Sequence, residues 1–189
     1  NLPIETLKLE NYYDRGKPIR PISVRGKEMV SNRVPFAVDM QPEALDQEPN
    51  NAPESAQAVT LPIIVNGRID PPDDCDVFCF EGRAKEKFVA EVVARRLGSP
   101  LDSLLKLTDA SGKQIAVNDD YEDKASAMAT HHADSRISVT LPATGKYYLK
   151  LYDSQRKGGP DYAYRLHMRP PRPDFELRVV PSSVVVRAG

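Results

Sequence analysis

Residues 145–153, "GKYYLKLYD", alternate two kinds of side chain along nine positions. Tyr147, Leu149 and Leu151 fall on one side of an extended chain. Tyr148, Lys150 and Tyr152 fall on the other side. Alternation with a period of two indicates a β-strand that buries one face and leaves the other near solvent.

The same period recurs on both sides of this stretch, in residues 87–96, 135–142 and 161–168, and shorter apolar runs occupy 63–69, 76–81, 104–109 and 114–119. Turn sequences rich in glycine, proline and aspartate separate these segments. About eight strands at this spacing predict an all-β protein, an antiparallel jelly-roll-like β-sandwich. The expected shared core comprises Phe78, Phe80, Phe88, Leu105, Ile137, Val139, Leu149 and Leu166. One short helix is expected near 53–59, with Asn51 as its cap.

Composition restricts the function. The 189 residues are 40% hydrophobic and 28% charged, which suffices for a core. A net charge of −1 argues against nucleic-acid binding, and no apolar run approaches the ~18 residues of a membrane span. Cys75 and Cys79 lie four residues apart in an extended segment, roughly 13 Å at ~3.3 Å per residue, so they are expected to stay free thiols.

Five motifs follow one another in an order that resembles a known family: "EPNN" (48–51), "GRIDPPDDCDVFCF" (67–80), "SPLDSLLKLTDASGKQIAVNDD" (99–120), "DSRISVTLPATGKYYLKLYD" (134–153) and "GGPDYAYRL" (158–166). Together they resemble the bacterial pre-peptidase C-terminal domain, which is related to the collagen-binding domain of clostridial collagenases. The resemblance assigns residues 45–170 to this sandwich. Residues 1–44 are then a flanking segment, the end of a preceding domain or a linker. Residues 171–189 resemble a proline hinge and the first strand of a following immunoglobulin-like domain.

The resemblance implies secretion, no catalytic centre and, as in the collagen-binding relatives, a Ca²⁺ site. Carried onto this sequence, the calcium ligands are Asp46, Glu48, Asn50 and Asn51 in the linker and Asp73 and Asp76 at the strand entry. Two positions depart from the relatives' pattern, because Asp46 is shorter than the usual Glu and Asn51 replaces an acid.

The residue chemistry leaves two interpretations of these acids open. Calcium takes about 6–8 oxygen ligands, and the linker and strand entry supply enough of them when Asp70 and Asp74 are counted. Alternatively, Asp70, Asp73 and Asp74 belong to an exposed turn and the linker is solvated. A third acidic run, "NDDYEDK" (118–124), favours a turn in which Asp119 or Asp120 accepts hydrogen bonds from backbone amides.

The "ATHHADSR" run (129–136) contains the residue types of a hydrolase but not their arrangement. His131, His132, Asp134 and Ser135 are neighbours on one loop, whereas a catalytic triad assembles from separated positions. We expect Asp134 to cap the loop instead. Tyr148, Lys150 and Tyr152 are candidate ligand-binding residues, because tyrosine is favoured at recognition surfaces. The alternative is that this face packs against residues 1–42 or a neighbouring domain.

The sequence thus predicts a noncatalytic accessory module of a secreted, periplasmic or cell-surface bacterial multidomain protein, such as a peptidase. Its role would be binding, spacing or localisation. The expected partners are an extracellular polymer, protein or polysaccharide, or neighbouring domains of the same protein. Two alternatives remain, a purely structural spacer among β-sandwich domains and a carbohydrate-binding module. The absence of tryptophan counts against the latter.

Overall fold

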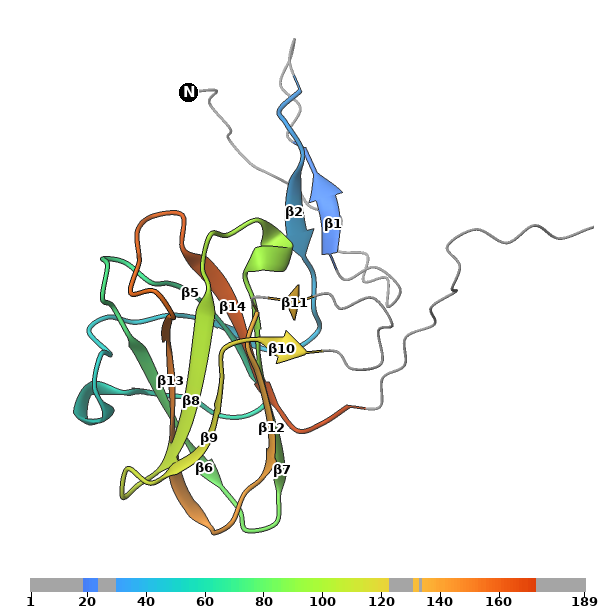
Figure 1. Cartoon of the computed structure of the whole chain (residues 1–189). Coiled ribbons are helices and arrows are strands. Elements are labelled where there is room, and N and C mark those ends of the chain that lie inside the picture. The colour runs from blue at the N-terminus through green and yellow to red at the C-terminus, as the bar shows by residue number, and fades with distance from the viewer. Residues whose placement is uncertain (1–18, 24–29, 123–130, 133, 173–189) are drawn as a thin grey trace, which may run out of the picture.

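The computed structural model describes residues 19–23, 30–122, 131–132 and 134–172. Two five-stranded sheets face each other in these residues (Figure 1). Sheet 1 has the order β12-β7-β14-β5-β3, with bounds Arg136–Thr140, Lys87–Val93, Ala163–Arg169, Ile63–Arg68 and Glu43–Leu45. Sheet 2 has the order β4-β6-β13-β8-β9, with bounds Gln57–Ala58, Asp76–Gly82, Gly145–Asp153, Ser103–Asp109 and Gln114–Asn118.

The strand order confirms the predicted jelly-roll-like sandwich. All eight predicted strands form, as β5 to β9 and β12 to β14. They divide into the antiparallel sets β12-β7-β14-β5 and β6-β13-β8-β9. Each sheet also carries one short parallel edge strand that the sequence pattern did not predict, β3 beside β5 and β4 beside β6.

The core lies between the two sheets and is built from the predicted alternation. Seven of the eight expected core residues are buried, and Val139 is partly buried against them. Phe80 stacks on Phe88 across the sheets with ring centroids 4.6 Å apart, and on Tyr147 at 5.7 Å. Inward-facing aromatic and aliphatic residues thus join sheet 1 to sheet 2 along most of their length.

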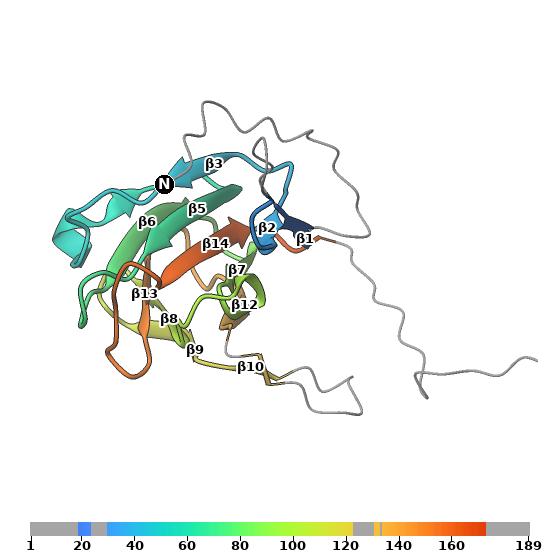
Figure 2. The same ribbon diagram turned by 90° about the horizontal axis from the view of Figure 1, so that it is seen from above.

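The first two described strands form a separate ribbon. β1 (Ile19–Ile22) pairs antiparallel with β2 (Val34–Ala37), and the ribbon lies beyond one end of the sandwich, where β2 contacts the 3₁₀ turn η2 (Arg95–Leu97) (Figure 1). Asp39 follows this ribbon, and its carboxylate lies 3.8 Å from the Nδ1 atom of His167 on β14. β3 lies beside β5 at the edge of sheet 1 (Figure 2). β3 begins at Glu43, inside the segment assigned to the flank by sequence.

The helix that the sequence predicts over 53–59 does not form, and this prediction is corrected. Only one 3₁₀ turn forms, η1 (Pro53–Ser55), and Ala52 rather than Asn51 precedes it. Gln57 and Ala58 instead pair with β6 as β4, because a strand partner is available there and a two-turn helix would forfeit that pairing.

A second 3₁₀ turn, η2 (Arg95–Leu97), and a short pair, β10 (Tyr121–Glu122) with β11 (His131–His132), complete the described elements. Cys75 and Cys79 are free, as predicted.

Leu149 tests the core most simply. It is fully buried at the middle of β13. We expect Leu149→Ala to lower the free energy of unfolding by about 3 kcal/mol, through lost transfer free energy and a residual cavity. Urea denaturation measures the change, with Val117→Ala, at a 51% exposed position, as the matched control. Equal effects of the two substitutions would contradict the assigned core.

Candidate functional site

The acidic linker crosses from one sheet to the other. Residues 46–56 connect β3, at the edge of sheet 1, to β4, at the edge of sheet 2. The Asp46 amide donates to the carbonyl of Asn66 at 2.9 Å, and the Val77 amide donates to the carbonyl of Asn50 at 3.0 Å. The linker is therefore held to β5 on one side and to β6 on the other.

Three carboxylates meet where the linker passes the start of β6. One oxygen each from Asp46, Glu48 and Asp76 lie within 4.8 Å of one another, and we call these three residues the acidic cluster. Asp76 faces inward and has no exposed surface. The Tyr164 hydroxyl, from β14 in the opposite sheet, donates a hydrogen bond to its Oδ2 atom. Its Oδ1 atom is buried and has no hydrogen-bond partner.

Asn50 adds a neutral oxygen beside the cluster. It is also fully buried, and its Nδ2 atom donates to Asp46 Oδ1 at 2.6 Å. Its backbone amide donates to Glu48 Oε2 at 2.9 Å. The Asn50 Oδ1 atom is buried without a partner, like Asp76 Oδ1. Buried polar atoms are usually satisfied, so the two unpartnered oxygens leave room at this cluster for a cation or an ordered water.

A glycine makes room for this arrangement. Gly67 on β5 lies opposite Tyr164 in the register of sheet 1. A Cβ atom at this position would overlap the Tyr164 hydroxyl and approach the Cβ atom of Asp46 to 2.7 Å. The tyrosine ring and the linker aspartate therefore share the space that an ordinary side chain would fill.

Burial and mutual repulsion raise the pKa values of the cluster. Burial raises the pKa of Asp76 to about 8; the negative charges of Asp46, Asp74 and Glu48 add to the rise, and the hydrogen bond from Tyr164 opposes it. Burial and then the charge of Glu48 raise the pKa of Asp46 to about 6. Burial raises the pKa of the Tyr164 phenol well above its usual value, so the hydroxyl remains a donor. Without a cation, the folded protein binds protons at this cluster.

Two predicted ligands lie outside the cluster. Asn51 is exposed, and its Oδ1 accepts a hydrogen bond from the Asn50 amide at 3.3 Å. Asp73 is exposed in the turn before β6, with a positive φ of 69°, and its amide donates to the carbonyl of Arg156 at 3.2 Å.

One interpretation of the sequence places Asp70, Asp73 and Asp74 in an exposed turn before β6, and this is wrong for Asp74. Asp74 is buried, and its carboxylate accepts hydrogen bonds from the amides of Asp70 at 2.9 Å and Cys75 at 2.8 Å. This carboxylate stabilises the turn and places Asp76 at the start of β6. Sequence analysis did not identify Tyr164 as a site residue. The signal available in the sequence was that Tyr164 and Asp76 both lie on the inward-facing sides of their strands.

The histidine-containing loop is organised around Asp134. The carboxylate of Asp134 accepts hydrogen bonds from the amides of Ala94 at 3.0 Å and Arg95 at 2.8 Å and pairs with Arg96 at 2.8 Å. It thus caps η2, a turn far away in sequence, rather than its own loop. Ser135 is buried, with its Oγ atom 2.8 Å from that of Ser103. The side chains of His131 and His132 lie outside the described residues.

The acidic turn after β9 matches the prediction. The Asp119 carboxylate accepts a hydrogen bond from the Asp120 amide at 3.0 Å. The neighbouring Asn118 side chain donates to the Asp120 carbonyl at 2.8 Å and accepts from the Arg136 amide at 2.7 Å. These acids are thus engaged in turn hydrogen bonds.

Tyr148, Lys150 and Tyr152 lie together on the outer face of sheet 2. All three are half-buried, and their neighbours Tyr147, Leu149 and Leu151 point into the core. The Arg156 guanidinium lies over the Tyr152 ring, 5.0 Å from its centroid. The three residues therefore share one face of β13, as the alternation in the sequence predicts.

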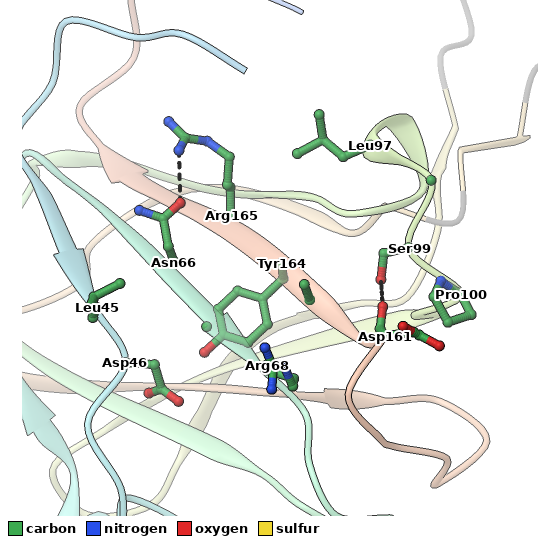
Figure 3. A pocket seen from close by; sticks show the side chains of 13 residues that line it. Leu45, Asp46, Asn66, Arg68, Leu97, Ser99, Pro100, Asp161, Tyr164 and Arg165 are labelled. Atoms are coloured by element: carbon green, nitrogen blue, oxygen red, sulfur yellow. Dashed lines mark hydrogen bonds between the residues drawn. The ribbon is translucent and has the colours of Figure 1, made fainter. Parts of the chain in front are cut away.

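An open cavity of about 840 Å³ borders the acidic cluster (Figure 3). Its lining includes Asp46 and Tyr164, together with Arg68, Leu97 and Pro100. The Ser99 hydroxyl donates to the carbonyl of Asp161 at 3.2 Å across one end. This mixed lining of acids, arginines and apolar residues shows no single ligand chemistry.

Comparisons with known proteins found similarity over part of the chain. No family model matches the chain. A curated protein, the probable subtilase-type serine protease of Deinococcus radiodurans, is 36% identical over 118 residues. That match covers 61% of this chain, and the chain spans 15% of the relative's length.

A solved structure shares the expected description. It is a crystal structure of the pre-peptidase C-terminal domain of a collagenase from Bacillus anthracis, with a TM-score of 0.47 and 20% identity, covering 64% of this chain and all of that one. The description of this structure names the same kind of domain that the five sequence motifs resemble. This is a resemblance to pre-peptidase C-terminal domains, and no functional residue is transferred from it. Among the described residues, no helix is long and apolar enough to cross a membrane.

Proton binding at the acidic cluster gives a pH prediction. The folded pKa values of Asp76 and Asp46, about 8 and about 6, exceed their unaltered value of 3.8, so over this window the folded state binds more protons than the unfolded state. With divalent cations chelated, the cluster's contribution to stability is therefore fully present below about pH 4 and is lost as pH rises toward 8.

Asp76→Asn should remove most of this pH dependence and should stabilise the chelated protein at pH 8. Urea denaturation of both proteins between pH 4.5 and 8.5 measures the difference. Parallel stability curves for the two proteins would contradict the assigned proton binding.

Proposed function

We propose that this chain is a noncatalytic accessory sandwich of a longer secreted or cell-surface bacterial protein, such as a peptidase, and that Ca²⁺ at the acidic cluster fastens its linker. The observation that carries the proposal is the convergence of Asp46, Glu48 and Asp76 within 4.8 Å, with a fully buried, unpartnered Asp76 Oδ1 among them. The similarity of part of the chain to a subtilase-type protease supports the peptidase context.

The donors fit a hard divalent cation. Calcium takes carboxylate, amide and carbonyl oxygens, and the cluster supplies three carboxylates and the free Oδ1 of Asn50. Histidine and cysteine, which softer metals prefer, do not belong to it. A charge of +2 would offset the mutual repulsion that raises the pKa values of Asp46 and Asp76. Bound calcium would displace protons from both groups, so its affinity should rise with pH.

The physical effect of the ion would be to hold the linker in place. Asp46 and Glu48 belong to the linker, whereas Asp76 belongs to β6 and is hydrogen-bonded to β14 through Tyr164. An ion bound to all three would join the linker to both sheets. The module would then hold a fixed orientation relative to whatever precedes it, which suits a spacing or binding role.

A binding role is favoured over a purely structural spacer by the partly exposed outer face of sheet 2. In the described part of the N-terminal segment, Asp39 contacts sheet 1 and β3 forms its edge, whereas Tyr148, Lys150 and Tyr152 lie on sheet 2 (Figure 2). The proposed ligand of this face is an extracellular polymer rather than nucleic acid, given the net charge of −1.

Thermal melts test the calcium site. Calcium at a hundred times its dissociation constant is expected to stabilise the fold by about 2.7 kcal/mol, a rise of several degrees in Tm. Asp76→Asn should abolish the response, and Asp119→Asn, which alters an exposed turn acid, should retain it. Isothermal titration calorimetry gives the stoichiometry, expected to be one ion per chain. An unchanged Tm in excess calcium at pH 8 would refute the site.

A further inference from the structure

The outer face of sheet 2 carries two lysines directly opposite each other. β13 lies between β6 and β8 (Figure 1), and Lys150 on β13 is in register with Lys106 on β8. Both side chains point outward, because Leu149 and Leu107 beside them are in the core. Directly opposed residues have Cβ atoms about 4.5–5.5 Å apart, and like charges there destabilise a sheet.

Neither lysine forms an ion pair in the described part of the chain. No described carboxylate lies within 4.0 Å of Lys106 or Lys150. The neighbour of Lys150 on its other side is Val77, which is buried and apolar. Two lysines that lie opposite each other concentrate positive charge locally in a chain whose net charge is −1.

A third cation, Arg156, lies in the turn that follows β13. The Arg156 guanidinium lies 5.0 Å from the centroid of Tyr152. Tyr148 and Tyr152 flank Lys150 on the same outward face, so aromatic rings and cations alternate along the strand.

This face suits a linear anionic ligand. We propose that Lys106, Lys150 and Arg156, with Tyr148 and Tyr152, bind an acidic polysaccharide built from uronic acid units. Tyr148 to Tyr152 extend about 13 Å along the strand at ~3.3 Å per residue, which is long enough for a short run of sugar rings. The cations would pair with the carboxylates and the tyrosine rings would cover apolar faces of the sugars. An acidic peptide would use the cations but not the alternating rings. The inference rests on the proposed binding role and not on the calcium site.

Binding of the 189-residue chain to polygalacturonate at low salt tests the inference, with dextran as the neutral polymer and poly-glutamate as the acidic peptide. We expect polygalacturonate to bind most tightly, dextran not to bind, and the affinity to fall as salt rises. Lys106→Gln and Lys150→Gln should each weaken binding about fivefold, and the double variant more than tenfold. Lys87→Gln, which removes one exposed charge from sheet 1, is the matched control and should bind normally.

The lysine variants also separate function from folding. Because each removes a like-charge contact, each should leave Tm unchanged or raise it slightly while weakening binding. Tyr148→Ala should reduce the preference for polygalacturonate over poly-glutamate. Absence of polygalacturonate binding, equal binding of poly-glutamate, or equal loss in Lys87→Gln would each overturn the inference. Repeating the titrations in chelator distinguishes the two proposals, since polymer binding should persist there even if no calcium site exists.

Discussion

The buried carboxylate of Asp76 is the constraint around which one end of the sandwich is arranged. It begins β6, faces the core and accepts a hydrogen bond from Tyr164 of the opposite sheet. Gly67 leaves the space that the tyrosine ring occupies, and Asp74 fixes the turn that delivers Asp76. Burying a charge without a partner is costly, so the structure around Asp76 must either keep it protonated or supply a cation.

The linker converts that local requirement into a property of the whole module. Asp46 and Glu48 approach Asp76 because β3 and β4 pair with different sheets and leave residues 46–56 to cross between them. Protonation relieves the repulsion at acidic pH, and a divalent cation would relieve it at neutral pH. Calcium would thus determine how firmly the sandwich is joined to the chain that precedes it, without taking part in any reaction.

Side-chain alternation predicted most of the fold, because strands that bury one face must repeat every second residue. That constraint located all eight main strands and the core residues from Phe78 to Leu166. It could not locate β3 and β4, which are too short to show a period and depend on distant partners. For the same reason, local signals favoured a helix over 53–59, where pairing with β6 prevails.

The candidate site, like the fold, could be predicted from the sequence only in part. The inward position of Asp76 followed from its place two residues before Phe78, and the structure brings Asp46 and Glu48 to it. Which acid serves the turn and which the cluster depends on backbone geometry, so Asp73 lies exposed and Asp74 is buried. Tyr164 and Lys106 come from strands distant in sequence, and only the sheet register shows that they face Asp76 and Lys150.

Hydrogen exchange at the Val77 amide tests the central claim most directly, because this amide donates to the Asn50 carbonyl and is exposed when the linker detaches. The account predicts that saturating calcium slows its exchange by up to about a hundredfold at neutral pH. The Lys85 amide, bonded to Leu141 away from the cluster, reports any general stabilisation. Equal calcium effects at the two amides, or none at Val77, would contradict a calcium-fastened linker.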